Sequence, residues 1–158
     1  MLPERASNSS NLPGEGEPDM SKIAHCNCGA LRLEVTGEPD AVVVCHCTDC
    51  QRRTGSVLGV GAYYPQDRVQ VTGESRVFAR VAASGRGLRQ NFCTSCGTTL
   101  FWTSDNKPDS IGVAVGGFAD PTFPAPVRSV WEQSHHGWVG LPLGIQHFLQ
   151  GRDSGPRT

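Results

Sequence analysis

The seven cysteines are the residues of this sequence whose type and spacing most clearly indicate chemistry. They fall into three groups: Cys26 and Cys28 in HCNCGA, Cys45, Cys47 and Cys50 in CHCTDC, and Cys93 and Cys96 in FCTSCGTTL. In a reducing compartment, such closely spaced thiols favour a metal over disulfides. Zinc takes four protein ligands in a structural site, and three plus an open position in a catalytic site. One site of each kind would use all seven thiols.

The two outer groups each supply half of a tetrahedral site. Each pair is followed by a glycine, Gly29 or Gly97, which permits the sharp turn of a metal knuckle. Pairing the two groups closes a long loop of chain, and closing a long loop removes much entropy from the unfolded state. We therefore predict a structural zinc on Cys26, Cys28, Cys93 and Cys96.

The middle group is compact enough to hold a metal by itself, because one tight loop brings its three sulfurs together. Three thiolates and Zn²⁺ carry a net charge of −1, whereas a fourth thiolate would make the metal a poorer Lewis acid and fill its vacancy. We predict a second, catalytic zinc on Cys45, Cys47 and Cys50. Its free position can accept a thiol or polarise a carbonyl oxygen.

Three other interpretations of the middle group remain open on the sequence alone. The group could complete a structural site with a fourth ligand from His46, His135 or His136. It could hold an iron–sulfur cluster, or it could release zinc on oxidation as a store or redox sensor. His46 lies between two cysteines, and in an extended backbone its side chain points away from them.

Composition excludes several classes of protein. The formal net charge is −1 and the pI is near 6.5, which gives no general attraction for nucleic acid or anionic lipid. No apolar run approaches the roughly 18 residues of a membrane helix. The first residues lack the basic and apolar regions of a signal peptide, so we expect a cytoplasmic protein. The sequence predicts no oligomeric state.

The length of 158 residues suits one domain. Residues 1–20 are rich in Pro, Ser, Asn and Gly and are predicted to be a disordered tail. We expect the folded domain to span residues 21–151, and residues 152–158 to form a loose C-terminal tail.

Inside the predicted domain, apolar residues recur with period two, as Leu31, Leu33 and Val35 do in ALRLEV. Further short runs, separated by turn residues, are AVVVC, SVLGVGAYY, RVQVTG, SRVFARVA, TTLFWTS and SIGVAVGGF. Eight or so such strands predict an all-β domain. The segment LPLGIQHFLQG could form at most one short helix.

Five segments together resemble one known family: HCNCGALRLEV, CHCTDCQRRTGS, FCTSCGTTLFW, VAVGGFADP and SVWEQSHHGW. In this order they are similar to the glutathione-dependent formaldehyde-activating enzymes of the Gfa and centromere-protein-V group. The resemblance covers Ile23 to about Phe148. It implies an all-β, Mss4-like (β-tent) fold whose sheets are stapled by the four-cysteine zinc. It also implies two zinc ions per chain, with the three-cysteine site as the catalytic one.

The activity implied by the resemblance joins formaldehyde to glutathione as S-(hydroxymethyl)glutathione, a carbon–sulfur lyase reaction in its synthetic direction. The expected partners are therefore a glutathione-like thiol and a small carbonyl compound. Arg52 and Arg53 are candidate contacts for a carboxylate of the thiol, because a guanidinium binds a carboxylate through two hydrogen bonds. Trp131, Trp138, His135 and His136 could wall the pocket or supply a general acid. The alternative is a non-catalytic zinc-binding interaction module, a role that the same fold serves elsewhere.

Overall fold

Within residues 20–156, the chain folds into two β-sheets and one short α-helix. A computed structural model describes residues 20–156. The smaller sheet is antiparallel, with strand order β1-β2-β5, and the larger one has eight strands in the order β11-β10-β3-β4-β9-β8-β7-β6. The all-β class predicted from the period-two pattern is confirmed.

The elements have the following bounds. The small sheet contains β1 (Ser21–His25), β2 (Arg32–Thr36) and β5 (Val69–Thr72). The large sheet contains β3 (Ala41–Cys45), β4 (Gly59–Pro65), β6 (Ser75–Val81), β7 (Gly87–Cys93), β8 (Thr99–Ser104), β9 (Lys107–Ala114), β10 (Arg128–Val130) and β11 (Gln146–His147). The helix is α1 (Thr48–Thr54), and the 3₁₀ turns are η1 (Gln66–Arg68), η2 (Val115–Phe118), η3 (Glu132–Ser134) and η4 (Arg152–Ser154).

One core is built from both sheets. Leu31, Leu33 and Val35 at and along β2 are fully buried, as their alternation predicts. They belong to the same cluster as Tyr64 of β4 and Leu100 of β8 in the large sheet. Burial of these side chains against one another holds the small sheet on the large one.

Four strands and the helix were not predicted from the pattern. The strands β1 and β7 are interrupted by polar residues, and β10 and β11 have only three and two residues. The segment LPLGIQHFLQG contains β11 and turns rather than a helix. The parallel pairs that include β10 and β11 join segments far apart in the chain, so no local pattern marks them.

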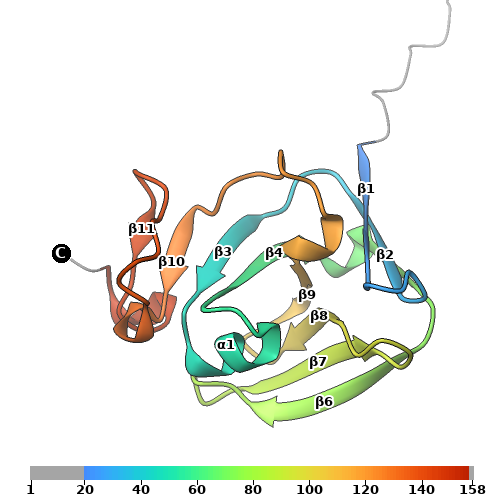
Figure 1. The fold of residues 1–158 in the computed structure, drawn as a ribbon, viewed down its shortest axis with the longest axis horizontal. Coiled ribbons are helices and arrows are strands. Elements are labelled where there is room, and N and C mark those ends of the chain that lie inside the picture. Colours follow the sequence, from blue (N-terminus) through green and yellow to red (C-terminus); the bar gives the residue numbers. More distant parts are fainter. Residues whose placement is uncertain (1–19, 157–158) are drawn as a thin grey trace, which may run out of the picture.

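The large sheet curls so that both of its ends reach α1. Figure 1 shows β10 and β11 on one side of the helix and β6 on the other. On the β6 side, Arg80 forms a 2.9 Å ion pair with Asp49 of α1. On the β10 side, the Gln51 side-chain amide of α1 donates a 3.1 Å hydrogen bond to the carbonyl of Ser134. The curl therefore encloses a hollow beside the helix.

The division into a tail, a domain and a second tail stays a prediction. Residues 1–19 and 157–158 lie outside the described part of the chain, and residues 152–154 form the turn η4. Within residues 20–156, no helix combines the length and the apolar character needed to cross a membrane.

Gly73 offers a test of how the two sheets are connected, because it lies where the chain passes from β5 to β6. Its φ is +99°, and a Cβ there would overlap the carbonyl oxygen of Ala30. Gly85 has a φ of +80° with open space around it. We expect Gly73→Ala to lower the free energy of unfolding by more than about 3 kcal/mol, and Gly85→Ala by about 1–2 kcal/mol. Urea denaturation of both variants measures the difference, and equal losses would contradict the close approach.

Candidate metal centres and adjoining cavity

Four sulfurs from the two outer groups converge on one point. The Sγ atoms of Cys26, Cys28, Cys93 and Cys96 lie within 4.8 Å of one another. Cys28 Sγ is 3.6 Å from Cys26 Sγ and 3.7 Å from Cys93 Sγ. A tetrahedron with zinc–sulfur bonds of about 2.3 Å has sulfur–sulfur edges of about 3.8 Å. The donor set and its spacing therefore fit a tetrahedral zinc.

The two cysteine pairs adopt similar turns. The Gly29 amide donates to the carbonyl of Cys26 at 3.0 Å, and the Gly97 amide donates to that of Cys93 at 2.9 Å. Both glycines have positive φ, +81° and +76°, as the knuckle prediction requires. The Leu31 amide also donates to Cys26 Sγ at 3.2 Å, which favours a thiolate there.

Thr98 links the two knuckles. Its hydroxyl accepts a 3.1 Å hydrogen bond from the Asn27 amide and lies 3.2 Å from Cys96 Sγ. The hydroxyl and the backbone amide of Thr98 lower the pKa of Cys96 to about 5. A thiol that ionises this readily is well suited to a metal ligand, because the thiolate is the form that binds.

The middle group forms a second cluster, separate from the first. The Sγ atoms of Cys45, Cys47 and Cys50 lie within 4.8 Å of one another, and no histidine or carboxylate of the described residues belongs to the group. Cys45 ends β3, Cys47 caps α1, and Cys50 lies in the first turn of that helix. A helix start, rather than the predicted loop, brings the three sulfurs together.

Electrostatics within this cluster favour a cation. Hydrogen bonds from the Cys45 and Cys50 thiols lower the pKa of Cys47, and the backbone amides of Cys50 and Asp49 lower it further. The same sulfur contacts raise the pKa of Cys45, because its thiol is the donor. Three crowded thiolates repel one another, so full ionisation needs a positive charge among them. The donor set therefore also fits zinc, bound with release of protons.

The backbone between Cys45 and Cys47 is held by hydrogen bonds from three elements. The carbonyl of His46 accepts from the Gln51 side-chain amide at 2.9 Å and from the Ser134 hydroxyl at 2.8 Å. The amide of His46 donates to the carbonyl of Val130 at 3.1 Å. These bonds fix the peptide groups that flank Cys45 and Cys47, and so fix the spacing of the sulfurs.

The three histidines considered as a fourth ligand have other contacts. His46 is fully buried, its Nε2 lies 3.0 Å from Ser129 Oγ, and burial lowers its pKa. His135 Nε2 lies 3.0 Å from the carbonyl of Val139, and His136 Nε2 lies 3.1 Å from the side-chain oxygen of Gln51. His46 therefore turns away from the sulfurs, as an extended backbone predicts.

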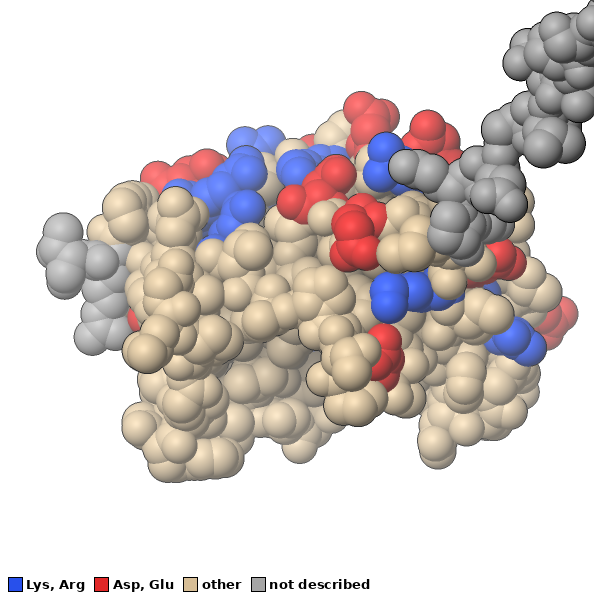
Figure 2. Space-filling view, turned by 90° about the horizontal axis from the view of Figure 1, so that it is seen from above, with Lys and Arg blue, Asp and Glu red and all other residues tan. Residues whose placement is uncertain are grey.

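The three thiols open onto a cavity of about 250 Å³ in the hollow of the curled sheet. Its wall includes five basic side chains, and none of its described lining residues is Asp or Glu. The basic residues are Arg53, Arg80, Lys107, Arg128 and Arg152. On the outer face seen in Figure 2, by contrast, basic and acidic side chains lie interspersed. Positive charge is thus concentrated at the cavity of a chain whose net charge is −1.

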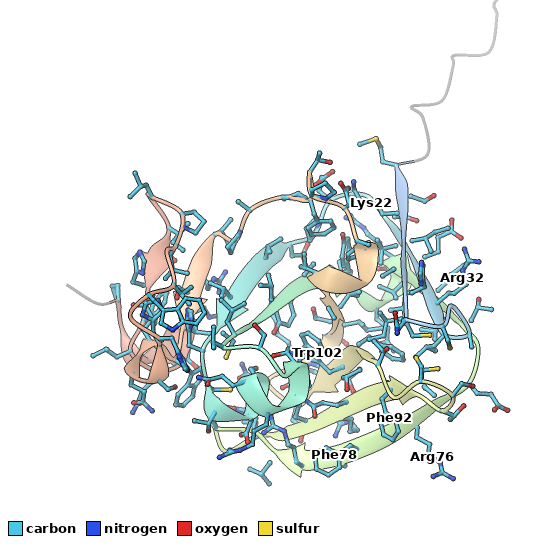
Figure 3. The ribbon with its side chains drawn as sticks, viewed as in Figure 1. Lys22, Arg32, Arg76, Phe78, Phe92 and Trp102 are labelled. Carbon is cyan, nitrogen blue, oxygen red and sulfur yellow. The ribbon has the colours of Figure 1, made fainter. Side chains whose placement is uncertain are left out.

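Trp102 forms a platform in this cavity. A Cβ on Gly61 would approach the Trp102 ring to 2.6 Å, and one on Gly112 would overlap the ring too, so the two glycines of β4 and β9 make room for the indole. The Arg53 guanidinium lies 4.6 Å from the ring centroid. Figure 3 shows Trp102 near the centre of the molecule. The stack holds one cation beside the three sulfurs.

The other residues proposed from the sequence are dispersed. Arg52 points outward, with 77% of its side chain exposed, and lies 3.9 Å from Asp49. Trp131 lines the cavity, whereas Trp138 is 75% exposed. A contact between substrate and Arg52 or Arg53 stays a prediction, but only Arg53 is among the lining residues.

Sequence reasoning missed most of the lining residues, among them Tyr63, Arg80, Trp102 and Arg128. Glycine inside a strand often marks a close approach, so Gly61 and Gly112 were an available signal for the Trp102 platform. No local signal marks the other three.

Fold and sites define an all-β protein with two cysteine clusters that fit metal ions, one of them open to a cavity. Residues 21–134 match the model of the family described as glutathione-dependent formaldehyde-activating enzyme. The chain belongs to this family, as the resemblance of its cysteine segments predicted.

Three curated relatives are each named "Putative glutathione-dependent formaldehyde-activating enzyme". That of Talaromyces marneffei is 28% identical over 69% of this chain and 63% of its own length. That of Penicillium rubens is 27% identical over 78% of this chain and 69% of its own length. That of Colletotrichum graminicola is 28% identical over 75% of this chain and 68% of its own length. The chain thus spans about two thirds of their length. A crystal structure of a Rhodobacter sphaeroides protein is 23% identical, with a TM-score of 0.48 over 63% of this chain and 91% of that one.

Removing single ligands should separate the two sites. We expect Cys47→Ser to lose about one of two bound zinc ions and to stay folded, because its cluster is not needed to join the sheets. We expect Cys93→Ser to lose the other zinc and to melt at a much lower temperature. Elemental analysis and thermal denaturation measure both effects. Loss of both metals and unfolding in Cys47→Ser would instead make its cluster structural.

Proposed function

We propose that the chain is a zinc-dependent carbon–sulfur lyase-type enzyme that joins a glutathione-like thiol to a small carbonyl compound such as formaldehyde. The observation that carries the proposal is the open cluster of Cys45, Cys47 and Cys50 in the wall of a basic cavity. A metal that only stabilises a fold is normally enclosed by four protein ligands. The names of the family and of its curated relatives support the choice of glutathione and formaldehyde.

A zinc ion held by the three cysteines would supply a fourth position at which a thiol is readily deprotonated. The chain's own contribution begins with substrate binding. At neutral pH glutathione has two carboxylates and one ammonium group, so the basic lining of the cavity favours its entry. The apolar parts of the wall, including the Trp102 platform, reduce the access of water to the reacting atoms.

Tyr63 is the best candidate for the proton donor. It lines the same cavity as the three cysteines, and burial raises the pKa of its phenol, which keeps the proton on at neutral pH. The rings of Tyr63 and Trp102 are in edge-to-face contact, with centroids 6.3 Å apart. An indole N–H can only donate a hydrogen bond, so this neighbour cannot accept the phenol proton and leaves the Tyr63 O–H available to a substrate.

The proposed reaction is balanced. The thiol loses its proton, its sulfur forms a bond to the carbonyl carbon of formaldehyde, and the carbonyl π electrons move to oxygen. The Tyr63 hydroxyl gives its proton to that oxygen, which yields S-(hydroxymethyl)glutathione, and the thiol proton restores the phenol through solvent. The reverse sequence releases formaldehyde.

Substitution of Tyr63 tests the assigned proton donor. We expect Tyr63→Phe to lower kcat by about 100-fold, the size of a typical general-acid effect, with little change in glutathione binding. Tyr64→Phe is the matched control, because Tyr64 is fully buried in the core and its hydroxyl has no partner among the described residues. The readout is the rate of formaldehyde–glutathione exchange by NMR above the rate without protein. Equal rates in the two variants would remove Tyr63 from the mechanism.

Thermal stability distinguishes the enzyme from an interaction module. Glutathione at a hundredfold excess over its Kd should stabilise the native protein by about 2.7 kcal/mol and raise Tm. The Cys47→Ser variant should show little of this shift, because it lacks the second metal. An unchanged Tm across a panel of small thiols would favour the non-catalytic module.

A further inference from the structure

We propose that Arg128 is the carboxylate-binding residue of the cavity and restricts the thiol substrate to compounds with a carboxylate near their sulfur. This inference rests on the proposed function, because it names the substrate class of the same site. Arg128 opens β10 and lines the cavity together with the three cysteines. No motif in the sequence around Arg128 indicates a role for this residue.

Among the described residues, the side chain of Arg128 has no hydrogen-bond or ion-pair partner. Its Nε atom is buried and has no hydrogen-bond acceptor among the described residues. Of the ion pairs within residues 20–156, none includes Arg128. A buried donor without an acceptor costs free energy, and a cation without an anion costs more. Such a group is suited to an anionic ligand, which would accept the hydrogen bond and neutralise the charge at once.

The other cations of the wall are less available. Arg80 is bound to Asp49 at 2.9 Å and to the carbonyl of Val81 at 3.1 Å. Arg152 lies 4.0 Å from Asp153 and is more than half exposed, and Lys107 is exposed. Arg53 is held against Trp102. Arg128 is thus the basic residue of the wall that combines a buried donor without an acceptor and the absence of an ion pair among the described residues.

Sheet register sets the spacing between the backbone positions of Arg128 and Cys45. Arg128 pairs with Val43 of β3, and Val130 pairs with Cys45. Arg128 and the partner position of Cys45 are therefore two residues apart along the parallel strands, a spacing of about 7 Å. In a cysteine-containing peptide, the carboxylate of the next residue lies at a similar distance from the sulfur. A thiol at the cluster can therefore direct a carboxylate to Arg128.

The backbone of β10 makes this position rigid, because Arg128 is paired on one side with Val43 and on the other with Gln146. A free Nε beside a terminal nitrogen forms a two-donor fork that matches the two oxygens of a carboxylate. Lysine has the charge but lacks this fork. The proposal therefore predicts that lysine cannot fully replace Arg128.

Calorimetry with S-methylglutathione tests the inference without relying on thiol chemistry, because the methyl group blocks the thiol. We expect Arg128→Gln to weaken binding by about tenfold to a hundredfold, as for loss of a charge-assisted hydrogen-bond pair. Arg128→Lys should lose most of the same affinity. Neither variant should change the binding of the diethyl ester of S-methylglutathione, which has no carboxylate.

Arg32→Gln is the matched control, since it removes the same charge from an exposed position on β2, in the small sheet away from Trp102 (Figure 3). Three results would overturn the proposal. Arg32→Gln could weaken binding of S-methylglutathione as much as Arg128→Gln does, or Arg128→Gln could weaken binding of the acid and of its diethyl ester equally. The third is that the unmodified protein does not bind S-methylglutathione. If Arg128→Gln does not fold, the affinities of Arg128→Lys for S-methylglutathione and for its diethyl ester test the proposal in its place. A failure to form S-(hydroxymethyl)glutathione refutes the proposed function but leaves the Arg128 comparison valid.

Discussion

The structure depends on the convergence of four sulfurs from two hairpins, one in each sheet. Cys26 and Cys28 lie between β1 and β2, whereas Cys93 ends β7 and Cys96 lies between β7 and β8. A metal at this point would tie the ends of the two sheets together, in addition to the shared hydrophobic core. Hydrogen bonds from Thr98 and from backbone amides already orient the sulfurs, so little further ordering is needed for binding.

The second cluster has a different physical character, because only three potential metal-binding side chains of the described residues meet there. Its geometry depends on the curl of the large sheet, which brings β6 and the turn η3 after β10 to the same helix. The hydrogen bonds to the peptide of His46 then fix the ligand spacing from three directions. The arrangement combines rigid ligands with an adjoining space, which is the combination that an open metal site requires.

The cavity owes its positive charge to residues contributed by distant segments. Arg53 follows the cysteines directly in the chain, but Arg80 and Arg128 come from strands near opposite ends of the sheet order. Two strand glycines, Gly61 and Gly112, make the space in which Trp102 lies and supports Arg53. The charge pattern is therefore a product of topology, and the net charge of the whole chain conceals it.

The sequence alone determined the all-β class, the family and the grouping of the seven cysteines into four and three. Those features are local: strand alternation such as Leu31, Leu33 and Val35, and cysteines followed by glycine, are written within a few residues of chain. Tertiary structure decided which side chains surround the second cluster. It turned Arg53 inward and Arg52 outward, and it brought Tyr63 and Arg128 beside sulfurs that are remote in sequence. The reason is that β10 has only three residues and pairs in parallel with β3, so its position follows from long-range packing and not from any pattern of its own.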